Sequence, residues 1–196
     1  MSRNLFFHYF SIMTDMVSSK ISTFIMWCIA RGLGINLGKR NTFRGLMKFR
    51  LYMDTAIMIG NSCKFHNKYA SNMIGVNHPC IIATHARRAS IRIGNHCGFS
   101  GTVIGAFASI TLGNNVRCGA NTLITDGDWH TDDPRCGAPK PIVIKDNVWL
   151  GYNAVVLKGV TIGNNTIIGA NSVVTKDIPA NVVAAGNPCR VIRELR

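Results

Sequence analysis

The chain has 196 residues, of which 47% are hydrophobic and 16% are charged, so it is long enough to bury one domain core and too apolar to be disordered. Its 22 lysines and arginines outnumber nine acidic residues, and the formal net charge is +13. This excess favours a polyanionic partner such as a phosphorylated cofactor or an anionic membrane. We find no aromatic and basic RNA-binding signature and no recognition-helix pattern, so we expect no nucleic acid partner.

Residues 1–36 differ from the rest of the chain because large apolar side chains follow one another closely. We expect one or two apolar helical segments there, broken near Ser18-Ser19. The longest apolar run, Phe24–Ala30, is far shorter than the roughly 20 residues that span a bilayer. No signal-peptide cleavage pattern follows it. Two interpretations stay open: a helical cap over the end of the next domain, or a membrane-associating segment with lysines and arginines against lipid headgroups.

From Leu37 onwards, apolar residues recur six positions apart, at first with irregular gaps. The early pairs are Leu37 and Phe43, Ile59 and Phe65, Ile93 and Phe99, and Leu112 and Cys118. We expect short loops in the gaps at 66–90 and 101–111. Seven cysteines occur without a C-x-x-C pair, which favours reduced, structural thiols. Because Cys63, Cys80 and Cys97 are spaced 17 residues apart, we expect them to stack inside the fold.

The segment 126–141 interrupts this pattern. The next in-phase apolar residue after Ile124 is Ile144, 20 residues later, and the sequence between them is rich in Gly, Asp and Pro. Four of the nine acidic residues lie within it, at positions 126, 128, 132 and 133. A long insertion on a rigid scaffold is usually functional, so we predict a projecting active-site loop.

The strongest periodicity lies between residues 144 and 180. Seven small or branched apolar residues occur exactly six apart: Ile144, Leu150, Val156, Ile162, Ile168, Val174 and Ala180. A period of six fits neither an α-helix nor a simple strand alternation. It predicts a chain that forms a short strand, turns and repeats, which is a hexapeptide β-helix. We therefore predict an all-β domain at 37–187, followed by a basic tail at 188–196.

Four motifs in the second half of the chain resemble those of the hexapeptide-repeat acetyltransferases. They are DNVWLG at 146–151, GVTIG at 159–163, VTKDIP at 174–179 and AAGNPCRVI at 184–192. The similarity is greatest to the sugar O-acetyltransferases of the galactoside/maltose and surface-polysaccharide types. The resemblance implies a left-handed parallel β-helix, acetyl-CoA as co-substrate without a metal, and a homotrimer with active sites between subunits.

His130 is the candidate catalytic base. It is the one histidine in the acidic loop, and acetyl transfer needs a group that takes the proton of the acceptor. Asp126 or Asp128 could hold the other ring nitrogen, and the sequence leaves the choice open. The segment TDGDWH at 125–130 resembles the Asp-rich loop of polysaccharide O-acetyltransferases, which ends in the presumed base. The nearest other histidine is His96, which argues against a three-histidine zinc site.

The resemblance also implies the donor site. Matching positions for acetyl-CoA are Gly151 and Tyr152 near the thioester, Ala170 along the pantetheine arm, Thr175 and Lys176 further on, and Arg190 and Arg193 near the nucleotide phosphates. A backbone N–H around Gly151 is a candidate donor to the oxyanion. Candidate acceptor contacts, by proximity alone, are His85, Ser100 and Asn121.

The sequence thus favours an acetyl-CoA-dependent O-acetyltransferase that acts on a sugar hydroxyl in surface polysaccharide or lipopolysaccharide biosynthesis. The alternative is N-acetylation of a nucleotide-linked amino sugar or another small amine. We expect the enzyme in the cytoplasm, at the inner face of the membrane if residues 1–36 bind lipid. The acceptor and its reacting group are not determined by the sequence.

Overall fold

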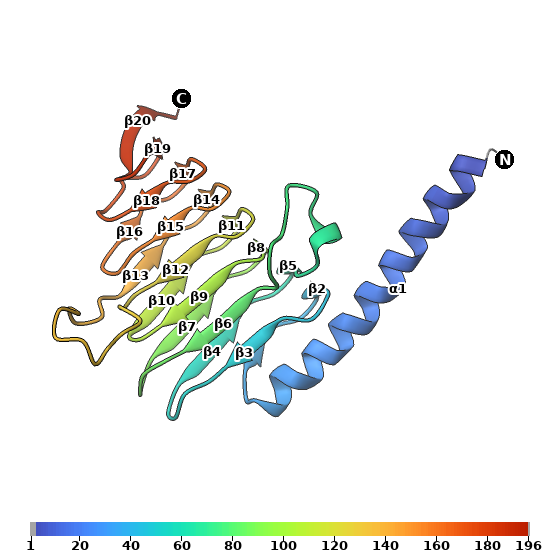
Figure 1. The fold of residues 1–196 in the computed structure, drawn as a ribbon, viewed down its shortest axis with the longest axis horizontal. Helices are drawn as coiled ribbons and strands as arrows, with labels where there is room; N and C mark the ends of the chain where they lie inside the picture. The colour runs from blue at the N-terminus through green and yellow to red at the C-terminus, as the bar shows by residue number, and fades with distance from the viewer. Residues whose placement is uncertain (1–2, 196) are drawn as a thin grey trace.

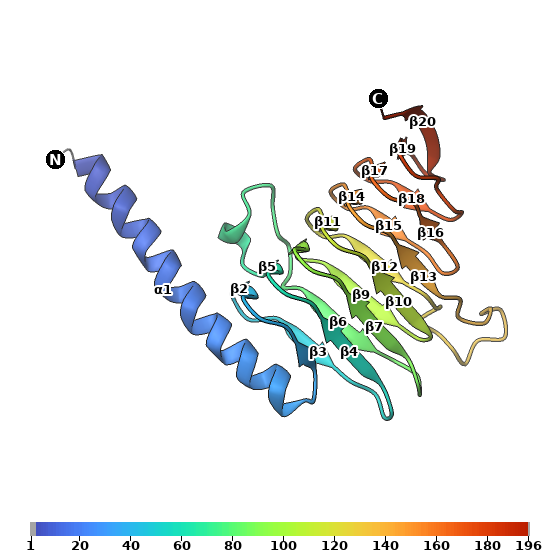
Figure 2. The same cartoon turned by 180° about the vertical axis from the view of Figure 1, so that it is seen from behind.

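The computed structural model describes residues 3–195, which form a parallel β-helix with one long helix at its N-terminal end (Figures 1 and 2). The chain winds through three sheets in turn, so that each coil contributes one strand to each sheet. Sheet A contains β1 (Asn36–Leu37), β4 (Ala56–Ile59), β7 (Ser90–Ile93), β10 (Ser109–Leu112), β13 (Ile142–Ile144) and β16 (Thr161–Ile162). Sheet C contains β3 (Lys48–Arg50), β6 (Ile81–Thr84), β9 (Val103–Ala106), β12 (Leu123–Thr125), β15 (Val155–Val156) and β18 (Val173–Val174).

Sheet B lies between the other two along the chain. It contains β2 (Thr42–Arg44), β5 (Lys64–His66), β8 (Gly98–Ser100), β11 (Arg117–Cys118), β14 (Trp149–Leu150), β17 (Ile167–Ile168), β19 (Val182–Ala185) and β20 (Arg190–Glu194). We name the turns after the sheets that they join, as the A/B, B/C and C/A corners. All strand pairs are parallel except the last, in which β20 folds back antiparallel on β19. The predicted tail is therefore a strand over most of its length.

Aliphatic and aromatic side chains stack along the interior, one above another from coil to coil. Phe43, Phe65 and Phe99 are fully buried neighbours in sheet B, with ring centroids 4.7 and 5.0 Å apart. Burying each such side chain stabilises the fold by about 1.5–3 kcal/mol, which explains why the strands from β4 to β19 each place an apolar residue inward.

The hexapeptide prediction is confirmed at six of its seven positions, from Ile144 to Val174, all of which have no exposed surface. It is wrong at Ala180, which is exposed. Ile178 takes the interior place instead, because it pairs with Ile162 and so closes the last turn two residues early. A residue count cannot register this shorter turn.

Asparagines form the tight turns of the A/B corner. Asn115, Asn147, Asn165 and Asn181 adopt φ values of 56 to 60°, a left-handed conformation that asparagine tolerates better than most residues. Their side chains also form a ladder, because each of the first three amides donates to the next carbonyl oxygen, at 3.1, 3.0 and 2.8 Å. The ladder satisfies these side chains in the four C-terminal coils, whereas Arg40, Ser62 and His96 hold the same left-handed position in the first three coils.

Helix α1 (Arg3–Gly32) covers the open N-terminal end with its C-terminal half only. Met26 and Ala30 are fully buried in the core, and the Ser22 hydroxyl donates to the Phe43 carbonyl at 2.5 Å. The N-terminal half projects beyond the β-helix (Figures 1 and 2). The predicted break at Ser18-Ser19 is wrong, since no proline or glycine lies between residues 3 and 31 to interrupt the helix. Within the described residues, no helix has the length and apolar character of a membrane span.

The cysteine prediction is correct for two of its three residues. Cys63 and Cys97 are buried in successive turns of the A/B corner, where each thiol lies near a carbonyl oxygen of the coil that follows. Cys80 is also buried, but it precedes β6 and lies near the His66 carbonyl instead. Equal spacing fails there because a loop at 67–80, containing the short 3₁₀ helix η1 (Tyr69–Ser71), lengthens that coil.

Candidate active site

The projecting loop leaves the C/A corner after β12 and returns to β13, as predicted (Figure 1). Asp126 is the first residue of the loop and anchors it to the preceding coil. This buried carboxylate accepts the backbone N–H groups of Phe107 and Ala108, at 2.5 and 3.0 Å. Burial raises the pKa of Asp126, and the backbone hydrogen bonds act in the opposite direction. The two carboxylate oxygens thus hold the turn of the preceding coil. Asp126 therefore has a structural role, in addition to the predicted role as a partner of His130.

An aromatic cluster of His85, Phe107 and Trp129 holds the next part of the loop. Trp129 meets the other two rings edge-on, with centroid distances of 4.6 Å to His85 and 5.6 Å to Phe107. Gly105 makes the space for the indole, because a Cβ there would lie 2.8 Å from the Trp129 ring. Since His130 follows directly, the seating of Trp129 decides where the backbone presents the candidate base.

Asp128 and Lys158 form a clamp between the loop and the coil beneath it. The Lys158 ammonium lies 2.5 Å from the Asp128 carboxylate and 3.1 Å from the Gly137 carbonyl. The Gly137 N–H donates back to Asp128 at 3.1 Å, which ties the two arms of the loop together. Lys158 holds the pKa of Asp128 below its usual range. Lys158 was missed by the sequence analysis, because nothing local distinguishes it from a solvated lysine.

His130 itself is exposed near the loop tip. Its carbonyl accepts the Asp133 N–H at 3.0 Å and the Cys136 thiol at 2.7 Å, so the backbone is well held. Within residues 3–195, no hydrogen bond joins the imidazole to Asp126 or Asp128. The predicted carboxylate partner is therefore not engaged in this single chain, and the ring is open to an incoming molecule.

The three candidate acceptor residues have structural neighbours. His85 lies in the aromatic cluster, and burial lowers its pKa. Ser100 accepts the Asn72 amide at 3.0 Å, while Asn121 donates to the Gly75 carbonyl and accepts the Asn77 N–H, both at 3.0 Å. Ser100 and Asn121 therefore fasten the loop 67–80 to the B/C corner. The sequence predicted a loop in the gap at 66–90, but not that these two residues hold it.

The donor positions at the B/C corner form a tightly stacked column. A Cβ on Gly151 would lie 2.6 Å from the Ala170 nitrogen, so coil stacking by itself requires glycine there. The Gly151 N–H donates to the Ile168 carbonyl at 2.8 Å, which occupies the N–H considered as an oxyanion donor. Tyr152 is half-buried and Ala170 exposed, so an extended molecule can reach this corner.

The predicted site residues divide between two corners of the prism, on either side of sheet C. His130, Thr175 and Lys176 lie at the C/A corner, whereas Gly151, Tyr152 and Ala170 lie at the B/C corner. Arg190 and Arg193 are exposed on β20 at the C-terminal end. One chain therefore separates the candidate base from the predicted thioester contacts. Within the described residues, no group of three or more His, Cys, Asp or Glu could hold a metal ion.

Comparison with known proteins agrees with this architecture. Residues 141–176 match the family described as bacterial transferase hexapeptide (six repeats). The galactoside O-acetyltransferase of Escherichia coli K12 is 44% identical over 113 residues, which cover 55% of each chain. Protein CapG of Staphylococcus aureus is 41% identical over 118 residues, covering 56% of this chain and 69% of that protein. The chain thus spans about half the length of the first curated relatives that it matches.

Among solved structures, an N-acyltransferase named AntD from Bacillus cereus, in complex with dTDP and coenzyme A, shares the fold. The TM-score is 0.64 at 16% identity, with 85% of this chain and 87% of that chain covered. The repeat, the three sheets and these relatives together define the class of protein. The chain belongs to the hexapeptide-repeat acetyltransferase family, and its β-helix is the left-handed parallel helix that the resemblance implied.

Proposed function

We propose that this protein is an acetyl-CoA-dependent O-acetyltransferase that acts on a sugar hydroxyl in the biosynthesis of a surface polysaccharide. The observation that carries the proposal is the projecting loop, which three separate contacts fix while it leaves the imidazole of His130 exposed. Rigid placement of one unoccupied base is what general base catalysis requires. We propose that the reaction takes place in the cytoplasm.

In the proposed reaction, His130 takes the proton of the acceptor hydroxyl as its oxygen attacks the thioester carbonyl. The tetrahedral intermediate then collapses, the carbon–sulfur bond breaks and the CoA thiolate leaves. The imidazolium returns the proton to the thiolate, so the base is restored and no other reactant is consumed. Thr175 and Lys176 are proposed to contact the donor at the same corner as His130, and Arg190 and Arg193 to pair with its phosphates.

We further propose a homotrimer whose sites lie between neighbouring chains. In a three-fold assembly around sheet C, the C/A corner of one chain faces the B/C corner of the next. That arrangement would bring His130 to the Tyr152 and Ala170 positions of the neighbour. The division of the site residues between two corners supports this proposal, because one chain cannot complete the site.

The first test is His130→Ala. We expect kcat to fall by about 10²–10⁴, the usual share of a general base, while the Kd for acetyl-CoA changes little. Retention of more than roughly a tenth of the wild-type kcat would contradict the assignment.

A second experiment identifies the acceptor. Acetyl-CoA consumption should be measured against matched pairs of sugars that carry either a hydroxyl or an amine at one position. Turnover of hydroxyl acceptors alone is the expected result. Turnover of amino sugars alone would replace O-acetylation with N-acetylation; the structurally similar AntD is named an N-acyltransferase.

A further inference from the structure

The N-terminal helix carries a far larger apolar surface than its role as a cap requires. Its buried contacts lie on one stripe, at Ser22, Met26 and Ala30. Large apolar side chains on its other sides are exposed, including Met13 at 57%, Ile21 at 57% and Phe24 at 67%. A continuous apolar surface on a projecting element usually marks an interaction site.

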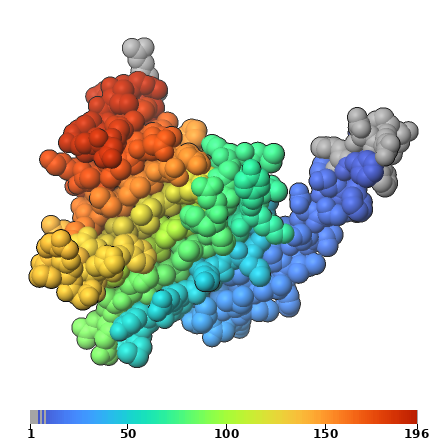
Figure 3. All heavy atoms as spheres, in the orientation of Figure 1, coloured from blue at the N-terminus to red at the C-terminus, as the bar shows by residue number. Residues whose placement is uncertain are grey.

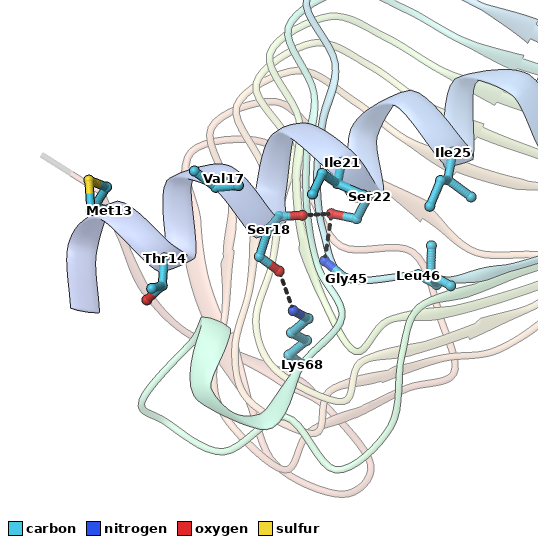
Figure 4. A pocket seen from close by; sticks show the side chains of 10 residues that line it. All are labelled: Met13, Thr14, Val17, Ser18, Ile21, Ser22, Ile25, Gly45, Leu46 and Lys68. Atoms are coloured by element: carbon cyan, nitrogen blue, oxygen red, sulfur yellow. Dashed lines mark hydrogen bonds between the residues drawn. The ribbon is translucent and has the colours of Figure 1, made fainter. Parts of the chain in front are cut away.

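One groove runs between α1 and the first coil (Figure 4). Its volume is about 520 Å³; Met13, Val17, Ile21 and Ile25 line it from the helix, and Leu46 lines it from the first coil. Lys68 lies at the rim, where its ammonium donates to the Ser18 hydroxyl at 2.6 Å (Figure 4). The groove is thus apolar along its length and basic at one margin.

A second groove, of about 760 Å³, flanks α1 where it meets Leu37–Phe43 of the first coil. Lys20, Phe24, Trp27 and Arg31 line it at helical spacings of four, three and four residues, so they form one stripe with basic ends and an aromatic centre. The Arg31 guanidinium lies 5.3 Å from the centroid of the Trp27 ring. Lys39 and Arg40 close the groove from the A/B corner of the first coil.

Among the side chains that the structure describes, the four cations of this second groove have no acidic partner in an ion pair. The ion pairs between described side chains are Arg87–Asp54, Arg135–Asp133 and Lys158–Asp128, and none involves Lys20, Arg31, Lys39 or Arg40. Four cations around two aromatic rings are complementary to an anionic lipid, because the cations can contact the phosphate headgroup and the rings can contact the acyl chain.

We propose that α1 and this second groove bind the surface of an anionic phospholipid membrane. Phe24 and Trp27 enter the boundary between headgroups and acyl chains, and the four cations contact lipid phosphates. A second copy of the chain fits less well, because it would bring the same positive charges against each other. This membrane site is independent of acetyl transfer and extends the proposed function by giving the enzyme a surface on which to act.

The test uses the full chain and sedimentation with vesicles of phosphatidylcholine, with or without about a quarter of phosphatidylglycerol. We expect binding to the anionic vesicles at low salt, little binding to the neutral ones, and release at high salt. The double variant Lys39→Ser/Arg40→Ser should bind about thirtyfold more weakly, from the loss of two basic residues near the surface. Phe24→Ser should also weaken binding to the anionic vesicles at low salt, because it removes one of the two aromatic rings that enter the boundary with the acyl chains.

The matched control is Arg92→Ser/Lys145→Ser, which removes two exposed charges from sheet A and its corner. It should bind nearly as well as the wild type, and thermal melting should confirm that every variant is folded. The proposal is overturned if the intact chain ignores anionic vesicles at low salt or if both double variants lose binding equally. Binding of a short DNA duplex but not of vesicles would also overturn it.

Discussion

At the scale of single residues, His85 combines burial with a titratable ring. Its Nε2 is buried without a hydrogen-bond partner among the described residues, and its ring packs on Phe107 and Trp129. Burial, followed by the charge of Arg50, lowers its pKa from the ordinary value of 6.5. The folded protein therefore favours a neutral His85, and protonation of this ring destabilises the aromatic cluster in which Trp129 packs.

This gives a prediction for stability against pH. As pH falls through the ordinary pKa of histidine, His85 takes up a proton in the unfolded chain before it does so in the folded chain. The folded state therefore loses stability as the pH falls, whereas at pH values above the ordinary pKa this stability is fully present. His85→Phe keeps an aromatic ring and removes the titration. We expect the melting temperature of the variant to fall less than that of the wild type between pH 7.5 and pH 5, and parallel curves would contradict the argument.

Two other contacts at this scale decide where the candidate base lies. Gly105 admits the Trp129 ring, and Lys158 closes the loop through Asp128. Neither residue is a candidate for the proton transfer, but each fixes the loop backbone from which the His130 side chain extends. Gly105 and Lys158 are accordingly positioning residues for His130.

At the scale of elements, α1 is one continuous helix whose two halves are in different surroundings. The C-terminal half contributes Met26 and Ala30 to the core, while the N-terminal half extends past the coils. The same substitution should therefore lower stability strongly in the C-terminal half and very little in the N-terminal half.

Met26→Ala should lower the free energy of unfolding by about 2–5 kcal/mol, because it leaves a cavity where a fully buried side chain stood. Met13→Ala is the control, and it should change that free energy by no more than roughly 0.5 kcal/mol because the side chain is mostly exposed. Denaturant unfolding of both variants measures the difference. Equal costs would mean that the C-terminal half of α1 does not cap the core.

At the scale of the whole molecule, the candidate site residues are divided between two corners, so the proposed trimer predicts that activity depends on assembly. His130→Ala disables the C/A corner, and Ala170→Glu should disable the B/C corner by placing a bulky negative charge in the proposed path of the donor. Each variant alone is expected to be inactive.

Co-expression of the two variants should restore activity. If sites form between chains, random mixing pairs an intact C/A corner with an intact B/C corner in about one quarter of the sites. Activity of the co-expressed mixture as a whole should therefore return to roughly a quarter of the wild-type level, and light scattering should give three chains per particle. No recovery in assembled mixtures would show that each site lies within one chain.

The sequence by itself determined the repeat, the projecting loop and the candidate base. Each coil places one apolar residue inward on each face, so the six-residue period is visible in the chain without knowledge of its neighbours. The loop was equally visible, because it interrupts that period between Ile124 and Ile144. His130 followed from the loop, since no other histidine lies in it.

Tertiary structure alone decided how these parts meet. The Trp129 ring packs over Gly105, Asp128 pairs with Lys158, and Ile178, instead of Ala180, lies inside the β-helix beside Ile162. In each case the partners come from different coils, and the length of the intervening turn sets which residues coincide. The structure also shows that His130 and Tyr152 lie at different corners of the three-sheeted β-helix. The sequence does not show this, because a six-residue period does not say at which corner a given residue lies.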